Sequence, residues 1–164
     1  MSTLPPDTLN SIGVLTRREV EARLLIPLIE ALSARFGQPA VLETIQQTIV
    51  DIARQQGQQL AESCPANDLL HFAHALEAWK KGDAMEIQVL EQTEHCFAFD
   101  VRRCRYAEMY HALGTPELGS LLSCSRDFAL IEGFNPSIHL TRTHTIMEGA
   151  DTCDFCYQLE PDPS

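Results

Sequence analysis

The chain has 164 residues with a formal net charge of -11 at neutral pH, and 45% of its residues are hydrophobic. This length suits one domain with a single core, and the composition is that of a globular protein rather than a disordered one. The negative charge disfavours binding to nucleic acid, because affinity for a polyphosphate backbone comes mostly from Lys and Arg contacts. No apolar run approaches the roughly 18 residues that cross a bilayer, and the N-terminus lacks the features of a secretory signal. We therefore expect a cytoplasmic protein that does not bind membranes.

Residues 1–14 show little periodicity and predict a flexible arm, followed by one domain over residues 15–160. The first predicted helix begins with Thr16 as its N-cap and ends at Gly37, since glycine commonly stops a helix. Apolar residues at helical spacing predict its buried face: Val20, Leu24, Leu25, Leu28 and Leu32. Two further helices are predicted, from about Pro39 to Gly57 and from Asn67 or Asp68 to Gly82.

After the third helix, the spacing of apolar residues changes from the helical period to the period of two that is typical of strands. The segments MEIQVLEQ and CFAFDV alternate apolar and polar residues and predict an antiparallel hairpin, and SIHLTRTHTI and DTCDFCYQLE predict a second one. Between the hairpins, RRCRYAEMYHALG and TPELGSLLSCSRDFALIEG predict two helices that end at Gly114 and Gly133, the second with Thr115 as its cap. This order predicts an α+β fold, in which N-terminal helices pack on a four-stranded, mostly antiparallel sheet with two further helices inserted between its hairpins.

Six cysteines are present, and in a reducing compartment we expect thiols rather than disulfides. Cys153 and Cys156 form a CDFC motif, but residues three apart on a strand point to opposite faces, which argues against one shared ion. Cys153 should share a face with Phe155 and Tyr157. Cys104 stands at the start of a short helix beside three arginines, where the helix dipole would lower its thiol pKa. The alternative for each thiol is a buried small side chain.

Two other residues are candidates for proton transfer. Asp127 lies one helical turn after Cys124 and should share its face, although it could equally be a solvated surface carboxylate. His144 is a candidate acid or base on a strand, because histidine titrates near neutral pH. His71 and His74 are three apart on a helix, and an ordinary helix surface is the simpler interpretation of that pair.

Taken together, several short motifs resemble the L-2-amino-thiazoline-4-carboxylic acid hydrolase family of bacteria over about residues 15–160. The most specific motifs are at Cys104 to Ala107, Glu117 to Gly119, Cys124 to Asp127, Asn135 to Ile138, Arg142 to Thr145 and Gly149 to Phe155. Cys156 stands where many relatives are expected to have a basic residue. The resemblance implies a hydrolase that opens a cyclic amidine, in the named case turning L-2-amino-thiazoline-4-carboxylate into N-carbamoyl-L-cysteine.

Such a reaction needs a nucleophile, a proton donor for the leaving group and a cation for the substrate carboxylate. The predicted catalytic residues are Cys104, Cys124, Asp127, His144, Cys153 and Asp154, and the predicted substrate-binding residues are Arg103, Tyr106, Arg142, Thr143 and Thr145. Cys104 or Cys153 is the predicted nucleophile. The proton carriers would be His144 with Asp127 or Asp154, and the carboxylate clamp would be Arg142 or Arg103.

Three cysteines from separate elements, Cys104, Cys124 and Cys153, could converge with Asp127 at one end of the sheet. They could do so as a nucleophile with polar helpers or as ligands of a divalent metal ion such as Zn or Mn. A different class of function is a non-catalytic sensor that binds a small molecule in the same pocket. The sequence is also compatible with self-association into a homo-oligomer.

Overall fold

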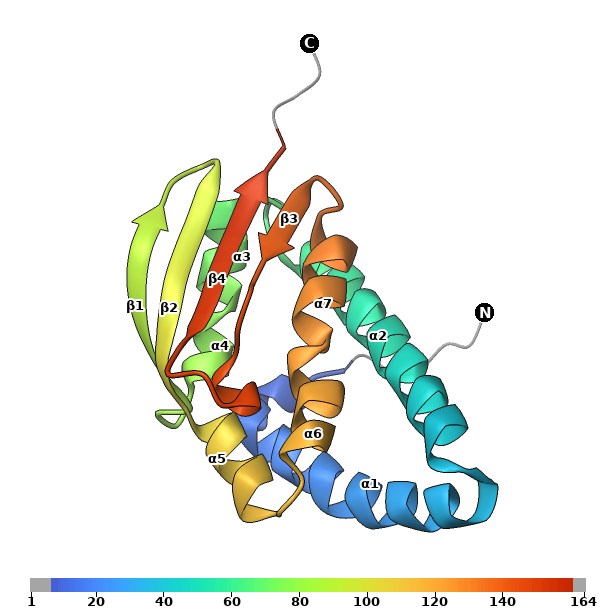
Figure 1. The fold of residues 1–164 in the computed structure, drawn as a ribbon. Helices are drawn as coiled ribbons and strands as arrows, with labels where there is room; N and C mark the ends of the chain where they lie inside the picture. Colours follow the sequence, from blue (N-terminus) through green and yellow to red (C-terminus); the bar gives the residue numbers. More distant parts are fainter. Residues whose placement is uncertain (1–6, 161–164) are drawn as a thin grey trace.

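A computed structural model of the chain describes residues 7–160. The helices are η1 (Leu9–Ile12), α1 (Val14–Phe36), α2 (Gln38–Ser63), α3 (Leu69–Ala75), α4 (Glu77–Lys80), α5 (Arg105–Ala112), α6 (Pro116–Gly119), the π-helix η2 (Ser120–Cys124), α7 (Arg126–Phe134) and η3 (Ile146–Glu148). The strands are β1 (Met85–Gln92), β2 (Cys96–Cys104), β3 (Ile138–Thr141) and β4 (Cys153–Leu159). Figure 1 shows the sheet on one side of the molecule, with α2 and α7 beside it and α1 below.

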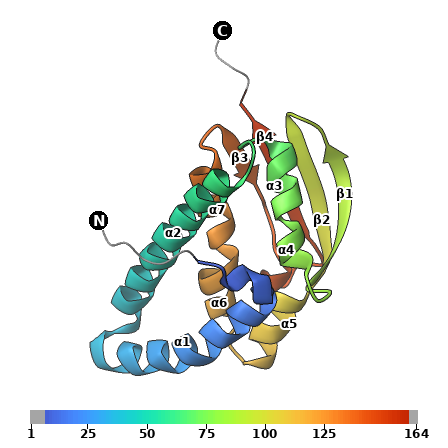
Figure 2. The same cartoon turned by 180° about the vertical axis from the view of Figure 1, so that it is seen from behind.

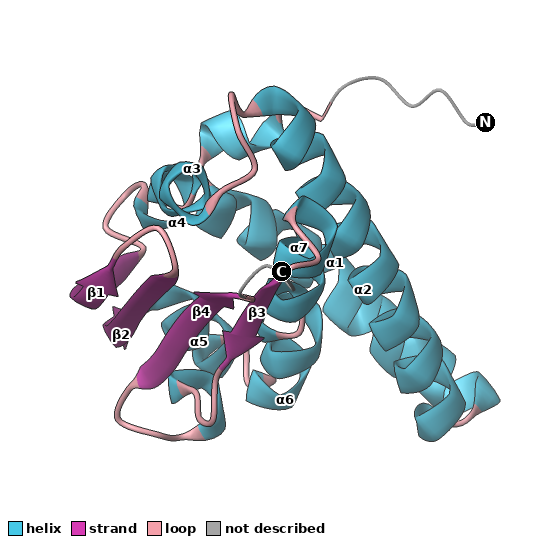
Figure 3. Ribbon diagram, turned by 90° about the horizontal axis from the view of Figure 1, so that it is seen from above, coloured by secondary structure: helices cyan, strands magenta, loops and turns pink. Residues whose placement is uncertain are grey.

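The four strands form one sheet in the order β1-β2-β4-β3, and every neighbouring pair is antiparallel. Helices α5, α6 and α7 lie between the two hairpins in sequence, so the predicted α+β fold is confirmed. Seen from behind and from above, α3 and α4 cover one face of this sheet (Figures 2 and 3). The covered face carries the core.

The inward residues of the two central strands alternate with outward ones, as the period-two pattern predicts. The buried residues are Phe97, Phe99, Val101, Cys153, Phe155 and Tyr157. Phe99 and Phe155 stack across the strands with ring centroids 4.9 Å apart. Cys153 therefore shares the buried face with Phe155, and Cys156 points the other way, as predicted.

The first helix has the predicted end but not the predicted buried face. It begins at Val14, so Thr16 lies inside it, and Gly37 follows its last residue with φ 90°. Val20, Leu24 and Leu28 are exposed, whereas the buried residues are Val14, Arg18, Ala22, Ile26 and Ile29. The apolar residues of this stripe, Val14, Ala22, Ile26 and Ile29, pack in one core cluster with buried side chains of α5 and η2.

Helices α2 and α7 cross at a close approach of their backbones. The prediction that Gly57 ends the second helix is wrong, since α2 continues to Ser63 with Gly57 buried inside it. A Cβ at Gly57 would lie 2.1 Å from the carbonyl oxygen of Leu130, and a Cβ at Gly133 would lie 2.0 Å from that of Arg54. Both glycines permit this contact rather than terminating a helix.

Three other predicted elements are interrupted. The third helix has Asp68 as its cap, with the carboxylate accepting from the His71 N–H, but it divides at Leu76 into α3 and α4. The predicted helix after Thr115 contains the π-helix η2 between α6 and α7, and Thr115 makes no capping hydrogen bond through its side chain. The strand predicted over residues 137–146 is only β3, because Asp154 draws the following residues out of the ladder.

Residues 1–6 of the predicted arm lie outside the described residues. From Asp7 onward the segment is more ordered than predicted, since it forms η1 and Asp7 makes an ion pair with Arg17 at 2.8 Å. Within residues 7–160, none of the helices combines the length and the apolarity that crossing a bilayer requires.

Candidate active site

A cavity of about 720 Å³ lies between the sheet and the N-terminal helices, a volume typical of sites for small molecules. Its wall includes residues of η1, helices α1 to α5, η2 and α7, strands β1, β2 and β4, and the segment after β3. Seven of the residues predicted for the site line it: Cys104, Tyr106, Cys124, Asp127, Arg142, Thr145 and Cys153. The fold thus brings together side chains that are up to 49 positions apart in the chain.

Asp127 and Arg142 form an ion pair inside the cavity wall. Burial raises the pKa of Asp127 to about 6, although the guanidinium of Arg142 opposes this change. Arg142 also donates to the carbonyl oxygen of Cys124 at 3.2 Å and stacks over Phe155, with its guanidinium carbon 5.2 Å from the ring centroid. A carboxyl group with a pKa near neutrality can both accept and release a proton in this cavity.

The thiols of Cys153 and Cys104 each accept a backbone hydrogen bond. Cys153 accepts from the N–H of Ile146 at 3.2 Å, and Cys104 accepts from the N–H of Ala107 at 3.5 Å as the N-cap of α5. Burial raises the pKa of Cys104 to about 11, so the predicted lowering by the helix dipole is wrong: the loss of solvation outweighs the N–H groups. Burial also raises the pKa of Cys153, but the Ile146 N–H and Arg142 oppose it.

Cys124 is partly buried at the cavity, and burial together with the charge of Asp127 raises its pKa. Within the described range 7–160, no group of three or more His, Cys, Asp or Glu side chains is arranged to hold a metal ion. The divalent metal centre predicted at Cys104, Cys124 and Cys153 stays a prediction, which elemental analysis of protein purified without chelator tests.

The other predicted site residues do not line the cavity. The carboxylate of Asp154 accepts from the N–H and hydroxyl of Thr143 and from the N–H of His144, at 2.9, 2.6 and 2.9 Å. Partial burial would raise the pKa of Asp154, but these hydrogen bonds hold it below its ordinary value. His144 is exposed, 3.2 Å from Asp154. The hydrogen bonds of Asp154 to Thr143 and His144 fix the path of the chain after β3. They thereby position the neighbouring cavity residues Arg142 and Thr145.

Arg103 is also outside the cavity, because its guanidinium is exposed and paired with Glu108 at 2.7 Å. The sequence interpretation missed two buried arginines of the cavity, Arg18 and Arg126, which are each 7% exposed. Arg18 could have been recognised from its place four residues after Val14 and four before Ala22, in the stripe of α1 that is buried.

A family model described as L-2-amino-thiazoline-4-carboxylic acid hydrolase matches residues 17–157. A search of curated proteins gives no match. The matched range begins in α1 and ends in β4, so it includes every predicted residue that lines the cavity. The family's name denotes hydrolysis of a small heterocyclic acid, and the resemblance seen in the sequence is confirmed over most of the chain. The chain belongs to the L-2-amino-thiazoline-4-carboxylic acid hydrolase family.

Proposed function

We propose that the protein hydrolyses a small cyclic amidine that carries a carboxylate, with L-2-amino-thiazoline-4-carboxylate as the first candidate substrate. The observation that supports this most is the meeting of a thiol, Cys153, and a carboxyl with a pKa near 6, Asp127, at one cavity of about 720 Å³. Nucleophile and proton carrier in a cavity of this size are what ring opening at a C=N carbon needs.

In the proposed reaction, sulfur adds to the amidine carbon of the ring and gives a tetrahedral intermediate. The ring C–S bond then breaks, and its sulfur takes a proton and leaves as a free thiol that stays attached to the substrate chain. Water displaces the enzyme sulfur from the same carbon and forms the carbonyl of the product. One water molecule is consumed in total, and the enzyme thiol is restored.

Cys153 is the better candidate for the attacking sulfur. The charge of Arg142 favours and the charge of Asp127 opposes the thiolate forms of both Cys153 and Cys124, but Cys153 also accepts a hydrogen bond from the Ile146 N–H at 3.2 Å, which stabilises its thiolate. Because the thiol pKa stays raised, deprotonation requires a base, and Asp127 is the carboxyl at this cavity whose pKa suits that role. Tyr106 donates its hydroxyl proton to the carbonyl oxygen of Trp79 at 3.0 Å and so shapes the wall.

Incubation of the purified protein with L-2-amino-thiazoline-4-carboxylate tests the proposal. We expect release of one free thiol per substrate, followed with a thiol reagent, and N-carbamoyl-L-cysteine identified by mass spectrometry. No thiol release, with and without added Zn²⁺ or Mn²⁺, would remove this substrate.

The cysteines at the cavity should matter and those away from it should not. We expect Cys153→Ser, Cys104→Ser and Cys124→Ser each to lower kcat/KM at least about tenfold, a barrier increase of roughly 1.4 kcal/mol. Cys64→Ser and Cys96→Ser are the matched controls, because neither residue lines the cavity. Each variant is first compared with the wild type in thermal unfolding, since a buried hydroxyl can destabilise the fold. Normal turnover by all three cavity variants would leave their thiols with a packing role alone.

A second candidate is a non-catalytic domain that binds a small molecule. The raised pKa values of the cavity thiols favour it, because protonated thiols are poor nucleophiles. A ligand that binds in this cavity and is recovered unchanged after long incubation would support this function over hydrolysis.

A further inference from the structure

Arg126, the first residue of α7, is a buried cation at the cavity with an incomplete set of partners. Its Nε donates to the carbonyl oxygen of Leu122 at 2.7 Å, and its Nη2 donates to the carboxylate of Glu21 at 3.4 Å. Its Nη1 is enclosed and has no hydrogen-bond partner among residues 7–160. Buried donors are nearly always paired, so this nitrogen indicates a partner that the described residues do not supply.

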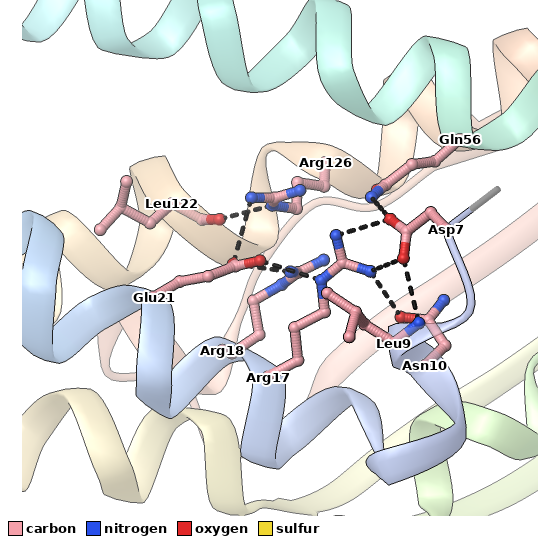
Figure 4. Close-up of polar contacts among 9 residues, drawn as sticks. All are labelled: Asp7, Leu9, Asn10, Arg17, Arg18, Glu21, Gln56, Leu122 and Arg126. Atoms are coloured by element: carbon pink, nitrogen blue, oxygen red, sulfur yellow. Dashed lines mark hydrogen bonds and ion pairs between the residues drawn. The ribbon is translucent and has the colours of Figure 1, made fainter. Parts of the chain in front are cut away.

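The charges around Arg126 are also unbalanced. Figure 4 shows the network of Arg126 and two arginines of α1 with the carboxylates of Glu21 and Asp7. Glu21 accepts from Arg18 at 2.8 Å and from Arg17 at 3.0 Å, and Asp7 pairs with Arg17. Three guanidinium groups thus share two carboxylates, which leaves one positive charge in a largely buried place.

The uncompensated charge faces the cavity. Arg18 and Arg126 both line it, whereas Arg17 does not, because it is held between Asp7 and Glu21. Burial lowers the pKa of Arg126 to about 10, and the like charge of Arg18 contributes to this lowering. Two neighbouring guanidinium groups with one spare positive charge form a site that suits a single carboxylate, since their N–H groups match its two oxygens.

We propose that the end of the cavity between Arg18 and Arg126 binds the carboxylate of the small-molecule substrate; the identity of that carboxylate rests on the proposed function. Arg142, one of the two clamp residues predicted from the sequence, is less suited because its guanidinium is committed to Asp127 and to the carbonyl oxygen of Cys124. Arg126 directly precedes Asp127 in α7, so the same helix turn holds the substrate's charge and presents the proton carrier.

Calorimetric titration with L-thiazolidine-4-carboxylate, whose saturated ring lacks the reactive C=N bond, tests this site without turnover. We expect the acid to bind the wild type at least about tenfold more tightly than its uncharged carboxamide does. In Arg126→Gln this preference should fall to about twofold or less. Arg102→Gln is the matched control, since Arg102 is an exposed arginine outside the cavity that pairs with Gln88 and Asp100, and it should keep the full preference.

Arg126→Gln takes one partner from Glu21 and can destabilise the fold, so Arg18→Gln, which leaves Glu21 paired with Arg17 and Arg126, is measured in parallel. It should lose the preference for the acid in the same way. Equal binding of acid and carboxamide by the wild type, absence of binding by both, or a preference that persists in these variants would overturn the assignment.

The outcome for this site is separable from the outcome for hydrolysis. Carboxylate binding that depends on Arg126, without turnover of L-2-amino-thiazoline-4-carboxylate, keeps the anion site and removes the proposed reaction. Turnover with kcat and KM unchanged in Arg126→Gln keeps the reaction and removes the anion site.

Discussion

Asp127→Asn is expected to lower kcat/KM by about 10²- to 10⁴-fold, the range that a positioned acid or base commonly contributes. Asparagine keeps the size of the side chain, but its amide can neither take a proton from a thiol nor return one to the leaving sulfur. Asp127→Glu keeps a carboxyl group and is the matched control, which should retain more activity than the amide variant. Initial rates of thiol release with L-2-amino-thiazoline-4-carboxylate give these values.

The pH dependence separates a role in proton transfer from a role in packing. Because the pKa of Asp127 is raised to about 6, the carboxylate form that acts as a base predominates above that pH and is lost below it. We therefore expect kcat/KM of the wild type to rise between about pH 5 and pH 7 with a midpoint near 6, and this rise to be absent in Asp127→Asn. If kcat/KM of Asp127→Asn still rose with pH at the same midpoint, the group that titrates would be one other than Asp127.

Gly133→Ala is expected to be the most destabilising single methyl addition, lowering the free energy of unfolding by about 3 kcal/mol or more. The new Cβ would meet the carbonyl oxygen of Arg54 at 2.0 Å, and backbone atoms cannot rotate away as a side chain can. Helices α2 and α7 would have to separate, which exposes the core between them. Urea denaturation followed by circular dichroism measures the loss.

Gly114→Ala is the control for this prediction. Gly114 has φ 76°, and a Cβ added to it would meet no atom within 4 Å, so alanine there adds backbone strain without a clash. That strain costs about 1 kcal/mol. If Gly133→Ala were no more destabilising than Gly114→Ala, the close contact of the two helices would be wrong.

The inward residues of the central strands could be predicted from the sequence, because a period of two with one buried face leaves a single register that hides Phe99, Cys153 and Phe155. The buried face of α1 could not. Leucines at helical spacing normally mark the core side, yet here Leu24 and Leu28 are exposed and the core side carries Arg18. Hydrophobicity alone cannot rank two candidate faces when the neighbours that select one are distant in sequence.

For the site, too, some residues could be predicted from the sequence and others could not. Cys104, Cys124, Asp127 and Cys153 were predicted from their chemistry, and they do line one cavity. The acidity of Cys104 was predicted with the wrong sign, because burial is a property of the whole fold and the helix start is local. Arg126 was missed for the same reason, since its partner Glu21 lies 105 positions away.

The π-helix at Ser120–Cys124 bears on how many residues can separate α6 from α7. A π-turn holds one residue more than an α-turn, and one residue corresponds to a rotation of about 100° around a helix axis. The wider turn absorbs its extra residue without that rotation, so deleting a single residue here would let α6 and α7 join as a regular helix while Arg126 and Asp127 kept facing the cavity. Relatives that share the cavity can therefore have one residue fewer between Gly119 and Arg126, with a regular α-helix in place of the π-helix.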